Sequence, residues 1–227
     1  MSPDRRGSGL SAEEFVDALA EENHAALARL GDLSRAGETP EALTVPRLLR
    51  VALKNEFEAS ELAAIWMAST QELDIKLALA RQCGDEAKHY RLIMERLISL
   101  GVDAKSIDPR DGGYSPLFEY LRSLEGPAAR VAAGQFTREG IALVRNQCFI
   151  EFCEAAGDAV TAALYRDTIQ PDERHHHELG RALLSVYGAG DEAQNLARQA
   201  ARRTIELAEE IQEMARLKAG IMRAPGC

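Results

Sequence analysis

Residues 83–92 read CGDEAKHYRL and contain an Asp-Glu pair with a histidine three positions after the glutamate. Residues 170–179 read QPDERHHHEL and repeat the same Asp-Glu-x-x-His pattern. The chain has only 5 histidines, so the repeat concentrates a scarce residue type in one arrangement. Residues i and i+3 lie on the same side of a helix, so each motif predicts a carboxylate and an imidazole that point to one place. These residues are Glu86 with His89 and Glu173 with His176.

Composition limits the function classes that the motifs could serve. The 227 residues carry a net charge of -9, which argues against a nucleic-acid partner because phosphate binding needs clustered Lys and Arg. No apolar stretch approaches the ~20 residues that span a bilayer, and the amino-terminal residues 1–10 lack the apolar core of a signal peptide. The 4 cysteines form no C-x-x-C pair. We therefore expect a cytoplasmic protein without a membrane partner.

Apolar residues recur at helical spacing along almost the whole chain, and only 5% of residues are aromatic, which predicts an all-α fold. We expect a single domain over 1–227, with an N-terminal helix at about 11–31 that begins in the capping box of Ser11 and Glu14. A C-terminal helix at about 190–219 is expected to carry Leu196, Ala200, Ile205 and Ala208 on its inner face. The core bundle at about 46–187 is predicted as helices at 46–70, 72–100, 128–155 and 158–187, with a long crossover between the second and third. Pro171 is predicted to bend the last of these.

Each helical hairpin supplies a further carboxylate at the level of its motif. Glu56 and Glu86 are centred on residue 71, and Glu139 and Glu173 are centred on residue 156, where in both cases a turn is predicted. Two residues placed symmetrically about a turn come to the same height in an antiparallel pair of helices. Glu151 and Glu154 are alternatives to Glu139 that the sequence leaves open. Paired with Glu173, they would be centred near residue 162, where no turn signal is visible.

Four carboxylates and two imidazoles are thus expected to converge in the interior of the bundle. Without compensation, four negative charges at low dielectric would cost many kcal/mol or would be forced to protonate. Two divalent cations neutralise them. Mixed carboxylate and histidine ligands suit two iron ions, or an iron and manganese pair, better than a structural zinc site.

Two other features compete with this interpretation. Glu21 and His24 also show the Glu-x-x-His spacing, but no aspartate precedes them and we interpret the pair as a solvated helix face. His175 and His177 flank His176, and each points about 100° away from the direction that Glu173 sets.

The residues resemble the ferritin-like di-iron carboxylate superfamily, whose bundles use one Glu from each of two helices and Glu-x-x-His from each of the other two. The run LKNEFEA at 53–59 is similar to the segment around the first iron ligand of bacterioferritins, which favours Glu56 over Glu58 and Glu61. The resemblance implies a ferritin-like four-helix bundle with one long crossover, in which Glu86 and Glu173 bridge the two metals. It also implies that Asp85 and Asp172 accept hydrogen bonds from ligating histidines. The implied metal ligands are Glu56, Glu86, His89, Glu139, Glu173 and His176.

The resemblance implies oxygen chemistry. We expect a di-iron oxidase or monooxygenase that takes dioxygen and a small organic substrate, with an external electron donor if it is an oxygenase. The alternatives are a ferritin-type iron oxidation and storage protein and a rubrerythrin-like peroxidase; the latter is disfavoured because C-x-x-C pairs are missing. A homodimer is left open.

Overall fold

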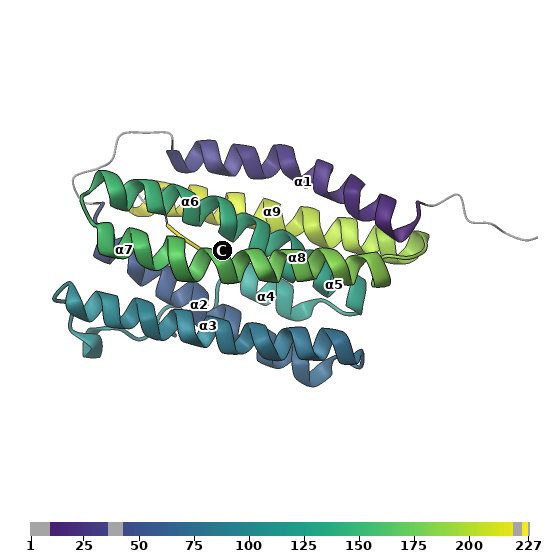
Figure 1. The fold of residues 1–227 in the computed structure, drawn as a ribbon, viewed down its shortest axis with the longest axis horizontal. Coiled ribbons are helices and arrows are strands. Elements are labelled where there is room, and N and C mark those ends of the chain that lie inside the picture. Colours follow the sequence, from purple (N-terminus) through teal and green to yellow (C-terminus); the bar gives the residue numbers. More distant parts are fainter. Residues whose placement is uncertain (1–9, 36–42, 220–223, 227) are drawn as a thin grey trace, which may run out of the picture.

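Every regular element that the structure describes is helical (Figure 1). The structure is a computed structural model that describes residues 10–35, 43–219 and 224–226. The all-α expectation is confirmed within these ranges, and no helix in them is long and apolar enough to cross a membrane. The expected features at residues 1–9, most of the linker before the second helix and Cys227 lie outside the described residues.

The α-helices follow the predicted order closely. They are α1 (Ala12–Arg35), α2 (Val45–Ser69), α3 (Leu73–Ser99), α4 (Pro116–Ser123), α5 (Pro127–Val131), α6 (Glu139–Ala155), α7 (Ala159–Leu164), α8 (Gln170–Tyr187) and α9 (Asp191–Ala219). A short 3₁₀ turn at Ala104–Ser106 and α4 lie in the crossover between α3 and α5.

The first helix begins as predicted and ends later than predicted. Ser11 and Glu14 form the capping box: the Ser11 amide donates to Glu14 Oε2 at 2.9 Å, and the Glu14 amide donates to Ser11 Oγ at 3.3 Å. Gly31, expected as the end, lies inside the helix and is buried. Its carbonyl accepts from the Cys148 thiol of α6, so tertiary packing overrides the weak helix propensity of glycine at this position.

Both helices of the second hairpin contain a π-helical segment, which the sequence analysis did not anticipate. One segment covers Ala132–Arg138 and leads into α6, and the other covers Tyr165–Ile169 and leads into α8. Instead of a simple bend at Pro171, the structure shows a wider helical turn that ends just before it, with the proline in the first turn of α8. A proline is tolerated there because it has no amide to place in the helical ladder. π-segments often occur at functional sites.

The helices pack as layers. α2 and α3 form a closely packed antiparallel pair, while α6 packs against α8, and α3 contacts α8 across the two pairs. α1 and α9 cover the other side of the second pair, as Figure 1 shows. One detail of α9 differs from expectation: Leu196 is 47% exposed, because the buried face passes through Ala197, Ala200 and Ala201 instead.

Within the described residues, the apolar core contains three clusters: a small one joins α1, α6 and α9, and the two larger ones follow each other along the helix axes. Of the two larger clusters, one contains Trp66 of α2 and Phe136 of the first π-segment, and the other contains Leu53 of α2 and Phe149 of α6. Between them, each of α2, α3, α6 and α8 buries polar or charged side chains. The fold therefore surrounds a polar layer with apolar packing on both sides.

Candidate metal centre

Six side chains from four helices meet in this polar layer, and all are nearly inaccessible to solvent. They form two overlapping groups whose ligand atoms lie within 4.8 Å of one another, and Glu86 and Glu173 belong to both groups. Position 1 is defined by Glu56, Glu86, His89 and Glu173, and position 2 by Glu86, Glu139, Glu173 and His176. The structure thus brings together all six residues that the sequence singles out; the largest exposed fraction among them is the 4% of Glu56.

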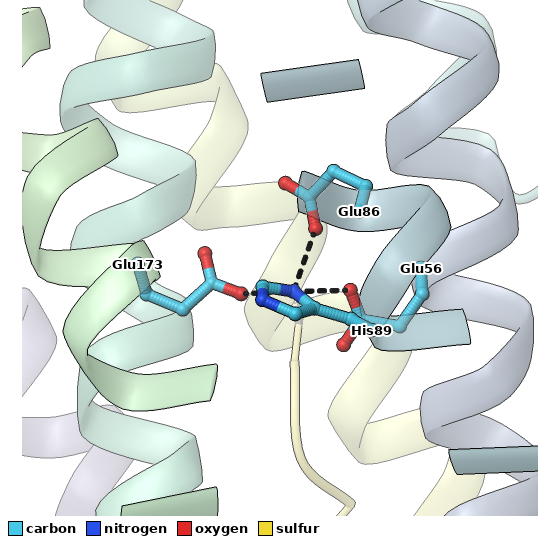
Figure 2. Close-up of side chains that lie close together, drawn as sticks. All are labelled: Glu56, Glu86, His89 and Glu173. Atoms are coloured by element: carbon cyan, nitrogen blue, oxygen red, sulfur yellow. Dashed lines mark ion pairs between the residues drawn. The ribbon is translucent and has the colours of Figure 1, made fainter. Parts of the chain in front are cut away.

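The imidazole of His89 faces three carboxylates. Its Nδ1 atom lies 3.3 Å from Glu86 Oε2, 3.5 Å from Glu56 Oε2 and 3.6 Å from Glu173 Oε1. Figure 2 shows these three groups arranged around one edge of the ring. The glutamates come from α2, α3 and α8, so the cluster joins helices of both hairpins.

His176 has an equivalent environment in position 2. Its Nδ1 atom lies 3.6 Å from Glu173 Oε2 and 3.7 Å from Glu86 Oε1. The two shared carboxylates thus present one oxygen toward each histidine. A carboxylate in that position can bridge two cations.

The outer nitrogen of each histidine contacts an aspartate of the opposite motif. His89 Nε2 lies 3.1 Å from Asp172 Oδ2, and His176 Nε2 lies 3.2 Å from Asp85 Oδ2. The aspartates accept the Nε2 protons and so fix the tautomers that leave Nδ1 with a lone pair. Both Nδ1 atoms are buried and without a hydrogen-bond partner in the described structure. Buried polar atoms rarely remain unpaired, so these two nitrogens fit a bound metal ion.

Lys88 joins the two aspartates on the outer side of the cluster. Its Nζ atom lies 2.5 Å from Asp172 Oδ2 and 3.6 Å from Asp85 Oδ1. The lysine charge lowers the pKa of Asp172, although burial opposes this effect, and keeps the carboxylate ionised as an acceptor for His89. One lysine therefore contacts both of the aspartates that orient the histidines.

Glu139 is held by residues that the sequence analysis missed. Its Oε1 atom accepts hydrogen bonds from Gln82 Nε2 at 2.6 Å and Arg138 Nη1 at 3.0 Å. Gln135 in turn donates to Gln82 Oε1 at 2.9 Å. Gln82 lies one turn before Glu86, so helical phase could have identified it. Arg138 immediately precedes Glu139, and adjacent residues of a regular helix point in different directions, so no sequence signal indicates this contact.

Without metal, the cluster must adjust its protonation. Burial raises the pKa of Glu56 to about 8 and also raises that of Glu173 well above its ordinary value. Burial would also raise the pKa of Glu86, but the close approach of His89 and the charges of both histidines when protonated lower it. Burial would lower the His89 pKa, but the nearby carboxylates of Glu56 and Glu86 outweigh it and raise the pKa to about 11. Bound cations would replace these protons as the compensating positive charge.

The alternative residues lie elsewhere. Glu58 accepts hydrogen bonds from the Ser115 amide at 2.9 Å and the Ser115 hydroxyl at 2.6 Å, which attaches the crossover to α2. Glu61 accepts a hydrogen bond from the Tyr114 hydroxyl. His177 is stacked on Phe136, with its Nδ1 atom 2.7 Å from the Phe136 carbonyl oxygen. The remaining candidates lie outside both groups: Glu151, Glu154, Glu21 and His24 are exposed, and His175 is half-buried.

Fold and site together define a helical bundle with a buried carboxylate and histidine cluster that could hold metal ions. No family model, curated protein or solved structure matches the chain.

Proposed function

We propose that the protein is a ferritin-like di-iron oxidase or monooxygenase. One observation carries the proposal: two buried ligand groups of one histidine and three carboxylates overlap in Glu86 and Glu173. Two cations would account for all six side chains: Glu56 and His89 would hold one, Glu139 and His176 the other, and Glu86 and Glu173 would serve both.

The arrangement of the helices supports the ferritin-like part of the proposal. One hairpin is formed by α2 and α3, and the other by α6 and α8 with their π-segments. A long crossover that includes α4 joins the hairpins. Each of the four helices supplies at least one of the six residues, as in bundles that use Glu-x-x-His on two helices and Glu on the others.

The donor set supports iron, with manganese as the alternative. Every cluster atom is a carboxylate oxygen or an imidazole nitrogen, and no thiolate belongs to either group. Four ionised glutamates balance two divalent cations, which leaves the histidines neutral. Two ferrous ions held in this way would supply electrons for the reduction of dioxygen.

The protein's own residues would control access and orientation. The two apolar clusters above and below the polar layer exclude water. Asp85 and Asp172 orient the two imidazoles, and Gln82 and Arg138 orient Glu139. No flavin or iron–sulfur binding motif appears in the sequence, so electrons for an oxygenase reaction would come from an external donor.

A small cavity beside the bundle is a candidate binding place for a small organic substrate. It has a volume of about 90 Å³ and lies between α2, α6, α9 and the carboxyl-terminal segment 224–226. Its lining is mostly apolar and includes Asn55, the residue before Glu56, but none of the six cluster residues. Other residues that line it are Val51, Leu117, Ile211, Ala215 and Ala224.

Anaerobic reconstitution with Fe(II) tests the proposal. We expect two metals per chain in the wild type and a large loss in both Glu86→Ala and Glu173→Ala, because each removes a ligand of both positions. Glu21→Ala is the matched control, since Glu21 is exposed and outside both groups. Admission of air should produce a transient visible absorption in the wild type and in Glu21→Ala, but not in Glu86→Ala or Glu173→Ala. Unchanged metal content in the two cluster variants would refute the proposal, and a large hollow assembly in size-exclusion chromatography would favour iron storage.

A further inference from the structure

The two terminal carboxylates of the cluster differ in their surroundings. Glu139, which belongs to position 2, has its Oε1 atom bound by Gln82 and by the guanidinium of Arg138. Glu56, which belongs to position 1, has no such amide or guanidinium partner among residues 10–35, 43–219 and 224–226; His89 Nδ1 approaches it at 3.5 Å. The cluster is therefore symmetric in its six side chains and asymmetric in what surrounds them.

We infer that a divalent cation fills position 1 before position 2, and that Arg138 determines this order. The inference rests on the proposed function, because it concerns the same cluster. It assigns to Arg138 the difference in metal affinity between two positions whose ligand types are identical.

Arg138 weakens position 2 in two ways. Its guanidinium and the amide of Gln82 hold one oxygen of Glu139, which leaves only the other oxygen for a metal ion. Its positive charge is also only 7% exposed and repels a cation at position 2 with little screening by water. Glu56 can offer both oxygens and has no cation beside it in the described structure, other than a histidine that a metal would keep neutral.

The histidines do not cancel this asymmetry. Each has its Nε2 atom bound by an aspartate, at 3.1 Å for His89 and 3.2 Å for His176. Lys88 contacts both aspartates, Asp172 Oδ2 at 2.5 Å and Asp85 Oδ1 at 3.6 Å, and Asp85 is also paired with Arg81 at 3.3 Å. Glu86 and Glu173 serve both positions. The contacts of Glu139 with Arg138 and Gln82 are thus the difference at the ligands themselves, and of these two partners only Arg138 carries a charge.

Titration of the full-length, metal-free protein with Mn(II) under anaerobic conditions tests the inference. Electron paramagnetic resonance separates a single bound ion from a coupled pair, and equilibrium dialysis gives the two dissociation constants. We expect a single-ion signal at one equivalent, a coupled signal at two, and dissociation constants at least tenfold apart. Glu56→Ala should abolish the tight step, and Glu139→Ala the weak step.

Substitution of the arginine tests its role directly. We expect Arg138→Gln to tighten the second step at least tenfold, so that the two steps merge, whereas Arg138→Lys should keep them apart because the charge remains. Arg145→Gln is the control: Arg145 is a buried arginine two turns further along α6 that donates to the Ala208 carbonyl. Two unchanged steps in a folded Arg138→Gln protein, or loss of the tight step in Glu139→Ala, would overturn the inference. Wild-type protein that binds no Mn(II) and no Fe(II) would instead refute the proposed function.

Discussion

His89 and Asp172 belong to different acidic motifs, yet the Nε2 atom of the histidine lies 3.1 Å from the Oδ2 atom of the aspartate. The reciprocal pair, His176 and Asp85, has an equivalent separation of 3.2 Å. The motifs are therefore crossed: the aspartate of each motif orients the histidine of the other motif. The orientation of both candidate histidine ligands therefore depends on the packing of α3 against α8.

This crossing predicts which metal each aspartate affects. Asp172→Asn should weaken the metal bound by His89 by about 10- to 100-fold, although Asp172 lies in the motif of His176, because the tautomer of His89 is no longer fixed. Asp85→Asn should weaken the metal bound by His176 in the same way. Metal titration of both variants measures the effect, with the exposed Asp167→Asn as control. The crossed arrangement would be contradicted if each substitution weakened only the metal bound by the histidine of its own motif.

The metal-free protein should lose stability as the pH rises from about 5 to 9. The folded state raises the pKa of Glu56 from 4.5 to about 8, and that of His89 from 6.5 to about 11. A group whose pKa is higher in the folded than in the unfolded state stabilises the fold at pH values below its unfolded-state pKa. This stabilisation is lost as the pH rises to the folded-state pKa. The expected loss is on the order of a few kcal/mol.

Thermal melts of chelator-treated protein at several pH values measure this dependence. Metal-loaded protein should show a much smaller decrease, because cations replace the protons. Glu56→Gln should flatten the decrease between pH 5 and 8, since the amide does not titrate. A melting temperature of the metal-free protein that rises over this range would contradict the prediction.

Gly180 allows α8 to approach the first π-segment. A Cβ atom at this position would lie 2.6 Å from the Gln135 carbonyl carbon and 2.7 Å from the Phe136 backbone nitrogen, so the backbone would have to move. We expect Gly180→Ala to destabilise the protein by about 1–3 kcal/mol in denaturant unfolding. Gly84→Ala is the matched control, because nothing lies within 4 Å of its Cβ position on the exposed face of α3. That variant should be stabilised by about 0.5–1 kcal/mol; equal effects of both substitutions would refute the close approach.

Asp158 anchors the turn between α6 and α7. Its Oδ1 atom accepts from the Thr161 amide at 3.0 Å, as a helix N-cap, and from Arg96 Nη2 of α3 at 2.7 Å. Asp158→Ala should therefore lower the free energy of unfolding by about 1–2 kcal/mol, mainly through loss of the cap. Metal stoichiometry should stay at the wild-type value, because the residue lies outside the cluster. A change in stoichiometry would show that this turn also controls the candidate site.

Much of the helical layout follows from local sequence signals. The capping box at Ser11 and the break around Gly157 predict helix ends because they act over a few residues. The end predicted at Gly31 is wrong because burial against α6 outweighs local propensity. The π-segments were also not predicted, since they reflect how the second hairpin packs within the bundle.

The sequence alone determined which side chains share a helix face and which stand at equal distances from a turn. Those two periodicities predicted Glu56 at the level of Glu86 in one hairpin and Glu139 at the level of Glu173 in the other. Only the tertiary structure decided that Asp172 supports His89 and that Arg138 binds Glu139. Both contacts depend on how far each helix is rotated about its own axis and on where it widens into a π-turn. Packing between helices sets these two quantities, and the spacing of residues along the chain does not.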